Sequence, residues 1–219
     1  MNEVIDLLPK LFEATGETLL LVSFSLLFGG IGGLLVGLVL YLTRQGNLYE
    51  QRFVNAVMNV VVNFFRPIPF IIFIAAVQPL SRLVVGSGIG TNAAIVALSL
   101  AATFGISRLV EQNLLTVSPG VIEAARASGA GRFQIVWSVI VPEALGPLIL
   151  GYTFAVVSLV DMSAVAGFIG GGGLGDFAIQ YGYRQFQPEV TWAAVIVIVI
   201  LVQGLQFLGN FLARKTLRR

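Results

Sequence analysis

The feature that most constrains this chain is its first long apolar stretch. Residues 19–42 contain no charged side chain, and comparable stretches follow along the chain, separated by polar segments. About 20 apolar residues in a helix cross the hydrocarbon core of a bilayer, where backbone polar groups must be satisfied within the segment itself. Only 11% of the 219 residues are charged, against about a quarter in soluble domains. We therefore expect an all-α membrane protein.

Five stretches are predicted to span the membrane. They cover residues 19–42, 56–80, 92–112, 144–169 and 190–212. The second is interrupted by Arg66, Pro67 and Pro69. Residues 1–18 show apolar side chains at helical spacing, which fits either an amphipathic helix on the outer membrane surface or a solvated tail. Residues 213–219 are expected to form a basic tail.

The basic residues predict the orientation. With five crossings, 9 of the 13 Lys and Arg residues fall on one side of the membrane. These nine are Arg44, Arg52, Arg108, Arg126, Arg132, Arg214, Lys215, Arg218 and Arg219. Lys and Arg are enriched in cytoplasmic loops, so we expect the N-terminus outside, the C-terminus in the cytoplasm, and the segment 118–142 in the cytoplasm.

The first predicted span contains Gly29, Gly33 and Gly37 at four-residue intervals. Such a stripe allows another helix to approach closely. We expect it to serve packing within the subunit, and an interface between subunits is the alternative.

The composition excludes several classes of function. The chain has no Cys and no His, which removes thiol chemistry, imidazole catalysis and the usual zinc sites. No Gly-Lys pair occurs, so the chain lacks the P-loop that binds nucleotide phosphates. Gly170, Gly172 and Gly175 match a dinucleotide-binding spacing, but that pattern requires a preceding strand. We expect no catalytic residue, no metal site, no cofactor in this chain and no nucleic-acid partner.

The segment 118–142 carries the most specific motif. Ser118 and Pro119 predict the start of a short helix, Gly129 predicts its end, and Pro142 is expected to break the helix that follows. A short helix with small residues on one face suits insertion into a groove of another protein. The alternative is a surface helix without a partner.

Within this segment the chain resembles bacterial ABC importer permeases of type I. The EAA signature of that family is Glu-Ala-Ala, three residues, Gly, nine residues, Ile-x-Leu-Pro. The matching residues here are Glu123, Ala124, Ala125, Gly129, Val139, Val141 and Pro142, with Val replacing Ile and Leu. The resemblance implies a coupling helix that docks, through Glu123, Ala124, Ala125, Ser128 and Gly129, into a separate ATPase subunit that binds ATP and Mg²⁺.

A second resemblance, over nearly the whole chain, is to the methionine uptake permeases of the same superfamily. The shared elements are Arg66-Pro67-Ile68-Pro69 and the glycine-rich loop after the fourth span. The resemblance implies a homodimer in the bacterial cytoplasmic membrane, two ATPase subunits, a substrate-binding lipoprotein outside, and methionine as substrate. Another amino acid or small solute is the alternative. The outer loop is expected to contact the binding protein through Gly172, Gly175, Tyr181, Tyr183 and Arg184.

Two charged residues in predicted spans are candidates for the transport pathway. Ionisable side chains within the membrane are costly and are functional candidates for that reason. Asp161 either meets a substrate ammonium group or pairs with Ser158, Ser163 or a backbone donor. Arg66 either faces the pathway or ties the broken span to nearby carbonyls. An ion-coupled secondary transporter is a further alternative, although such proteins carry internal repeats that we do not find.

Overall fold

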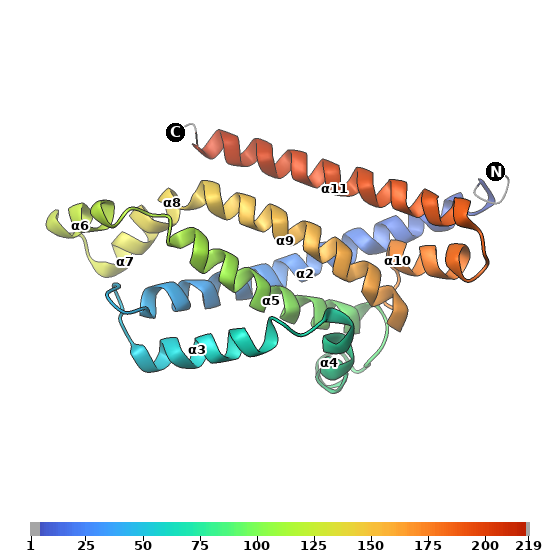
Figure 1. Cartoon of the computed structure of the whole chain (residues 1–219), viewed down its shortest axis with the longest axis horizontal. Helices are drawn as coiled ribbons and strands as arrows, with labels where there is room; N and C mark the ends of the chain where they lie inside the picture. The colour runs from blue at the N-terminus through green and yellow to red at the C-terminus, as the bar shows by residue number, and fades with distance from the viewer. Residues whose placement is uncertain (1–4, 218–219) are drawn as a thin grey trace.

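Long helices, most of them lying along one axis, make up most of the structure, a computed structural model that describes residues 5–217 (Figure 1). The long elements are α2 (Leu8–Thr43), α3 (Arg52–Phe65), α4 (Phe70–Val85), α5 (Thr91–Leu114), α9 (Leu145–Ala166) and α11 (Pro188–Leu217). Helix α4 is turned away from the common axis. Shorter helices gather at the two ends: α6 (Pro119–Ala127), α7 (Arg132–Ile135) and α8 (Val141–Glu143) at one, and α10 (Gly173–Phe177) at the other (Figure 1). No strand occurs in residues 5–217. The expected all-α class is confirmed.

Among the described residues, four single helices are long and apolar enough to cross a membrane, and a fifth crossing requires two helices together. The four are α2, α5, α9 with its extension to Ile169, and α11. The pair α3 and α4 passes only jointly and bends by 113° between Phe65 and Phe70. Proline disfavours helical backbone in the residue before it, and the break contains Pro67 and Pro69. The predicted interruption of the second stretch at Arg66, Pro67 and Pro69 is therefore seen in the structure as a sharp bend between two helices.

The outer limits of the first and last spans also differ from the prediction. Helix α2 begins at Leu8 with Pro9 in its first turn, a position that suits proline, so most of the predicted N-terminal region 1–18 continues into the span. Helix α11 continues to Leu217 and absorbs most of the predicted tail 213–219. Residues 1–4 and 218–219 lie outside the described residues. Both helices continue because no proline interrupts them within these regions, where one would break the helix.

The core of the bundle is the contact between α2 and α5. A Cβ atom on Gly29 would lie 2.6 Å from Ala102 Cβ, and one on Gly33 would lie 2.6 Å from Ile106 Cβ. Gly37 meets the next turn of α5 in the same way. A side chain at these positions would push the helices apart. The expectation that the glycine stripe packs within the subunit is confirmed.

Candidate functional site

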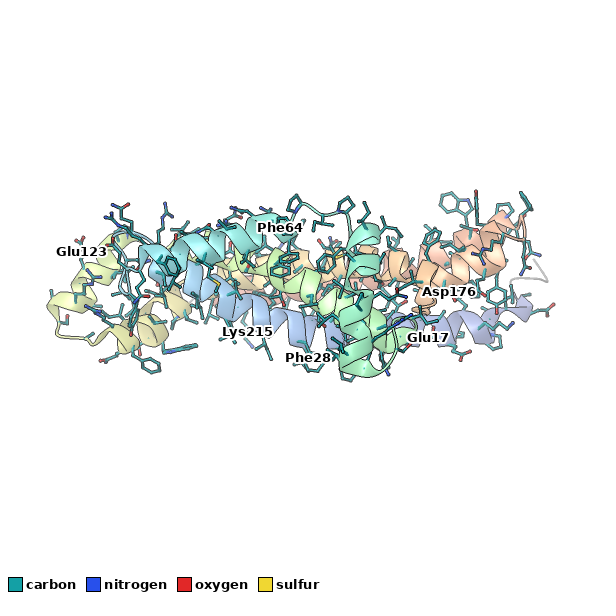
Figure 2. The ribbon with its side chains drawn as sticks, turned by 90° about the horizontal axis from the view of Figure 1, so that it is seen from below. Glu17, Phe28, Phe64, Glu123, Asp176 and Lys215 are labelled. Carbon is teal, nitrogen blue, oxygen red and sulfur yellow. The ribbon has the colours of Figure 1, made fainter. Side chains whose placement is uncertain are left out.

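Helix α6 projects from the bundle at the end where α5 stops and α9 begins (Figure 1). All of α6 lies in the described part of the chain, and none of its residues is buried. Figure 2 shows Glu123 at the extreme of the molecule. Ala125 is half-buried and packs on the core, whereas Glu123 and Ala124 are exposed. The structure therefore brings the predicted coupling residues together on a short, accessible helix.

The end of α6 is closed by its own backbone. Gly129 adopts φ +82°, its N–H donates to the Arg126 carbonyl at 3.0 Å, and the Ala130 N–H donates to the Ala125 carbonyl at 3.1 Å. This pair of bonds is a Schellman motif, which needs a left-handed residue and therefore favours glycine. The Ser128 hydroxyl donates to the Ala124 carbonyl at 2.9 Å. The predicted helix end at Gly129 is confirmed.

The predicted start of this helix at Ser118 and Pro119 is confirmed, since Ser118 occupies the N-cap position of α6, although its side chain forms no capping hydrogen bond within the described structure. The prediction for Pro142 is corrected. Instead of a break at Pro142, the chain widens into a π-helical turn over Val136–Ile140 and continues through α8. Proline cannot donate a backbone hydrogen bond and its ring crowds the preceding turn, so a wider turn makes room for it.

A polar cleft of about 510 Å³ lies beside α6. Arg126 and Arg132 line one wall, and the loop between α2 and α3 lines the other. In that loop, the Glu50 carboxylate accepts a hydrogen bond from the Gly46 amide at 3.0 Å and pairs with Arg52 Nε at 3.3 Å. The Gly46 amide, and next the Arg52 side chain, lower the pKa of Glu50. This end of the molecule therefore presents charge to water.

The opposite end is built differently, because α10 packs back onto the bundle. The Gly173 amide donates to Glu17 Oε2 at 2.6 Å and the Leu174 amide donates to Thr18 Oγ1 at 2.8 Å. Two side chains of α2 thus satisfy the first amides of α10. Figure 2 shows Glu17 beside Asp176 of α10 in this part of the molecule. Gly175 lies against the backbone of Ala164, with no room for a side chain.

This packing changes the set of residues predicted to contact a binding protein. Gly175 is buried, and Gly172 is half-buried beside the Glu17 carboxylate, so these glycines are less accessible than Tyr183 and Arg184 of the predicted set. Tyr181 is half-buried, with Lys10 Nζ 4.4 Å from its ring centroid. Tyr183 and Arg184 are exposed. These two residues remain available for such a contact.

The broken span forms one wall of a mostly apolar cavity of about 250 Å³. Helices α3, α4, α5 and α9 contribute its lining: Phe65, Arg66, Ile68, Phe70, Phe73, Ala101, Ala102, Phe104, Gly105, Ile106, Leu109, Phe154, Ala155, Ser158, Leu159 and Met162. Arg66 is the charged member of this set. The cavity therefore combines aromatic and thioether surface with one cation.

Of the two predicted pathway residues, Arg66 lines this cavity, whereas Asp161 is not among its lining residues. Arg66 is exposed, and no hydrogen bond from its side chain to a carbonyl is found among residues 5–217. Asp161 is exposed on α9, three residues after Ser158. The Ser158 and Ser163 hydroxyls donate to backbone carbonyls of their own helix rather than to Asp161. Neither of the two structural alternatives is therefore realised.

The sequence-based interpretation missed a polar cluster between α3 and α5. Arg108 Nη2 donates to the Oδ1 atoms of Asn59 and Asn63, both at 2.7 Å, and Arg108 Nη1 pairs with the Glu111 carboxylate. Arg108 and Glu111 side chains are 15% and 10% exposed. Arg108 had been assigned to the basic residues beside the membrane, whereas it lies inside α5. The Asn spacing of four residues, together with Asn55, was the signal available in the sequence.

Comparisons with known proteins agree with this geometry. Residues 20–218 match the family described as binding-protein-dependent transport system inner membrane component. A probable D-methionine transport system permease protein, MetI of Pasteurella multocida, is 42% identical over 94% of this chain and 97% of its own. The methionine import system permease protein MetP of Bacillus subtilis is 40% identical over 94% and 92%. A chain of the inward-facing MetNI methionine ABC transporter matches with TM-score 0.91 and 41% identity, over 94% of this chain and 95% of that one.

Proposed function

The chain belongs to the family of binding-protein-dependent transport system inner membrane components, and we propose on this basis that it is the transmembrane subunit of an ATP-driven methionine importer. The observation that carries the proposal is the exposed helix α6, which presents Glu123 and Ala124 to solvent while Ala125 packs on the bundle. A short exposed helix of this kind suits a groove on another protein. Relatives named for methionine transport, at about 40% identity over nearly the whole chain, support the substrate.

In this proposal, a separate subunit hydrolyses ATP. ATP and Mg²⁺ would be bound there, and closure of two such subunits would displace the α6 helices of a permease homodimer. Glu123, Ala124, Ala125, Ser128 and Gly129 would form the docking contact. An extracytoplasmic binding protein would deliver methionine at the α10 end, where Tyr183 and Arg184 are exposed.

The charge distribution supports a cytoplasmic position for the α6 end in a bacterial cell membrane. Exposed basic residues at this end are Arg44, Arg52, Arg126, Arg132, Arg214 and Lys215. Such enrichment is typical of cytoplasmic segments. Helices α2 and α11 both run toward this end, which would place their N-terminal ends outside (Figure 1).

The cavity beside the broken span supports methionine as the solute. A thioether side chain contacts aromatic rings favourably, and Phe65, Phe104 and Phe154 line this cavity. Arg66 would meet the substrate carboxylate. Asp161, on the neighbouring exposed turn of α9, would meet the ammonium group.

The proposal is tested by reconstituting the chain with its co-expressed ATPase and binding protein in proteoliposomes. Uptake of radiolabelled methionine should require ATP and the ATPase, and unlabelled methionine should compete better than other amino acids. Uptake that persists without the ATPase would indicate an ion-coupled transporter instead. Competition dominated by another solute would retain the importer and replace the substrate.

The pathway assignment is tested by Arg66→Gln and Asp161→Asn. Each should reduce methionine uptake about tenfold, as expected for the loss of a charge-assisted hydrogen bond worth about 1.4 kcal/mol. Arg44→Gln, an exposed arginine outside the cavity, is the matched control. Uptake equal to that of the control would remove these residues from the pathway.

A further inference from the structure

Helix α3 is attached to its own subunit mainly by polar contacts. Of its residues only Val62 is buried, while Phe53, Val60 and Phe64 are 81%, 69% and 66% exposed. The side facing the bundle carries asparagines at four-residue intervals. An apolar helix face gains little by packing in lipid, where hydrogen bonds and close packing decide which helices associate. Its asparagines therefore determine where α3 sits.

These asparagines form a continuous ladder. Asn55 Nδ2 donates to the Leu40 carbonyl of α2 at 2.8 Å, Asn59 Nδ2 donates to Asn55 Oδ1 at 3.0 Å, and Arg108 joins Asn59 and Asn63 to α5. The guanidinium group presents several donors in a fixed plane. Arg108 can therefore hold two amides and one carboxylate at once.

Glu111, which pairs with Arg108 in this network, lies close in sequence to the coupling helix α6. Glu111 precedes the end of α5 at Leu114 by three residues, and Ser118 at the start of α6 follows four residues later. Leu114 and Val117 are buried at 0% and 5% exposure. The link between α5 and α6 is thus short and packed, so a displacement of α6 moves the end of α5.

The C-terminal end of α3 lies at the apolar cavity beside the broken span. The Phe65 ring stacks on Phe104 of α5, with centroids 4.7 Å apart, and Phe65 and Arg66 line the cavity. The bend of 113° follows directly. A motion of α3 therefore moves the cavity wall and is absorbed at Pro67–Pro69.

From these contacts we infer that Arg108 and Glu111 are positioning residues for transport. Arg108 clamps α3 to α5 through Asn59 and Asn63, and Glu111, one turn further along α5, holds the Arg108 side chain in place. Separating the two helices would leave the mostly buried guanidinium group without its two amide acceptors, so α3 and this part of α5 move as one body while α4 pivots at the bend. Movement of α6 then reaches the cavity wall at Phe65 and Arg66. The inference rests on the proposed function, since it assumes that an ATPase moves α6.

The test removes the asparagine partners on α3 and leaves the Arg108–Glu111 ion pair intact. In the complete transporter, the double substitution Asn59→Leu with Asn63→Leu should lower the number of methionine molecules imported per ATP hydrolysed by about fivefold or more, within the range of coupling between distant sites. ATP hydrolysis and co-purification of the ATPase should persist. Asn210→Leu on the exposed side of α11 is the matched control. A ratio equal to that of the control would overturn the inference.

A second variant decides the question if the double variant does not assemble. Arg108→Lys retains a positive charge opposite Glu111, but one ammonium group cannot present the planar fork. It should lower the import ratio in the same direction. A wild-type ratio in this variant would overturn the clamp.

A distance measurement tests the clamp without relying on the substrate. The chain has no Cys, so spin labels can be placed at Val60 and Leu115, both exposed, with one labelled chain per complex. Their separation should be the same in nucleotide-free and ATP-trapped complexes and should change between these states in the double asparagine variant. A shift in the wild-type background would overturn the inference. Failure of wild type and Asn210→Leu alike to import methionine would instead overturn the proposed function.

Discussion

The short helices at the two ends of this bundle differ in how far the rest of the chain buries them. Each end carries a short helix between long ones, and each uses glycine with positive φ: Gly129 at +82° beside α6, and Gly172 and Gly173 at +78° and +85° before α10. Yet α10 buries most of its residues, including Leu174 and Phe177, whereas α6, fully within the described chain, buries none.

The difference lies in where the backbone and side chains find partners. The first amides of α10 bind Glu17 and Thr18 of another helix, and Gly175 lets α10 touch the backbone of α9. Helix α6 relies on the Schellman bonds at its own end. The α10 end is buried against the chain itself, whereas the α6 end stays largely exposed, which is where we propose that the ATPase docks.

Among the substitutions considered, replacement of a glycine should give the largest difference in stability between the two ends. Gly175→Val places a branched side chain against the backbone of Ala164, and overpacking of this kind costs about 3 kcal/mol or more when the backbone must move. We expect loss of folded protein, or a large fall in the unfolding midpoint in detergent. Gly131→Val is the control, since Gly131 has φ −67° and open space around its Cβ position. Equal stability of the two variants would contradict the claim that α10 is tightly packed on the bundle while the region beside α6 is open.

Charge reversal should affect the α6 end without changing its stability. Glu123→Arg should lower ATP-dependent uptake about tenfold or more, because an unfavourable charge in a desolvated contact costs at least about 1.4 kcal/mol. The unfolding midpoint should stay near wild type, since exposed substitutions change stability by about 0.5 kcal/mol at most. Glu143→Arg, exposed on α8, should retain uptake. A stability loss in Glu123→Arg would mean that α6 is part of the subunit's own core.

The sequence predicted the features that depend on local pattern. Apolar length predicted the helices, the glycine stripe of the first span predicted close helix packing within the subunit, and Gly129 predicted the end of α6. Features that depend on partners distant in sequence were not predictable. The capping of α10 by Glu17 and Thr18 joins residues 156 positions apart, and no periodicity connects them. Arg108, near the end of the predicted span 92–112, was counted only as a basic residue of the cytoplasmic side, because a single charge at a span boundary gives no sign of Asn59 and Asn63 opposite it.

Removing the cap of α10 should have an intermediate effect. Thr18→Val keeps the shape of the side chain but leaves the buried Leu174 amide without its acceptor, at a cost of about 1–3 kcal/mol. The unfolding midpoint should fall accordingly. Thr15→Val, one turn earlier, removes only a hydroxyl bond to the Leu11 carbonyl of its own helix and should stay near wild type. If both variants were equally stable, the α10 end would not depend on this contact.

The smallest effect concerns the exposed loop beside α6. The folded-state pKa of Glu50 lies below its ordinary value of 4.5, so its bond to Gly46 stabilises the loop above pH 4.5 and is lost as pH falls through the lowered value. Glu50→Gln should therefore reduce hydrogen-exchange protection of the Gly46 amide at pH 7, and the difference from wild type should vanish in more acidic solution. Glu143→Gln should not alter that protection. Global stability should hardly change, because exposed ion pairs contribute little. A fall in the unfolding midpoint as large as that of Thr18→Val would show that the α6 end, like the α10 end, is stabilised by contacts within the chain.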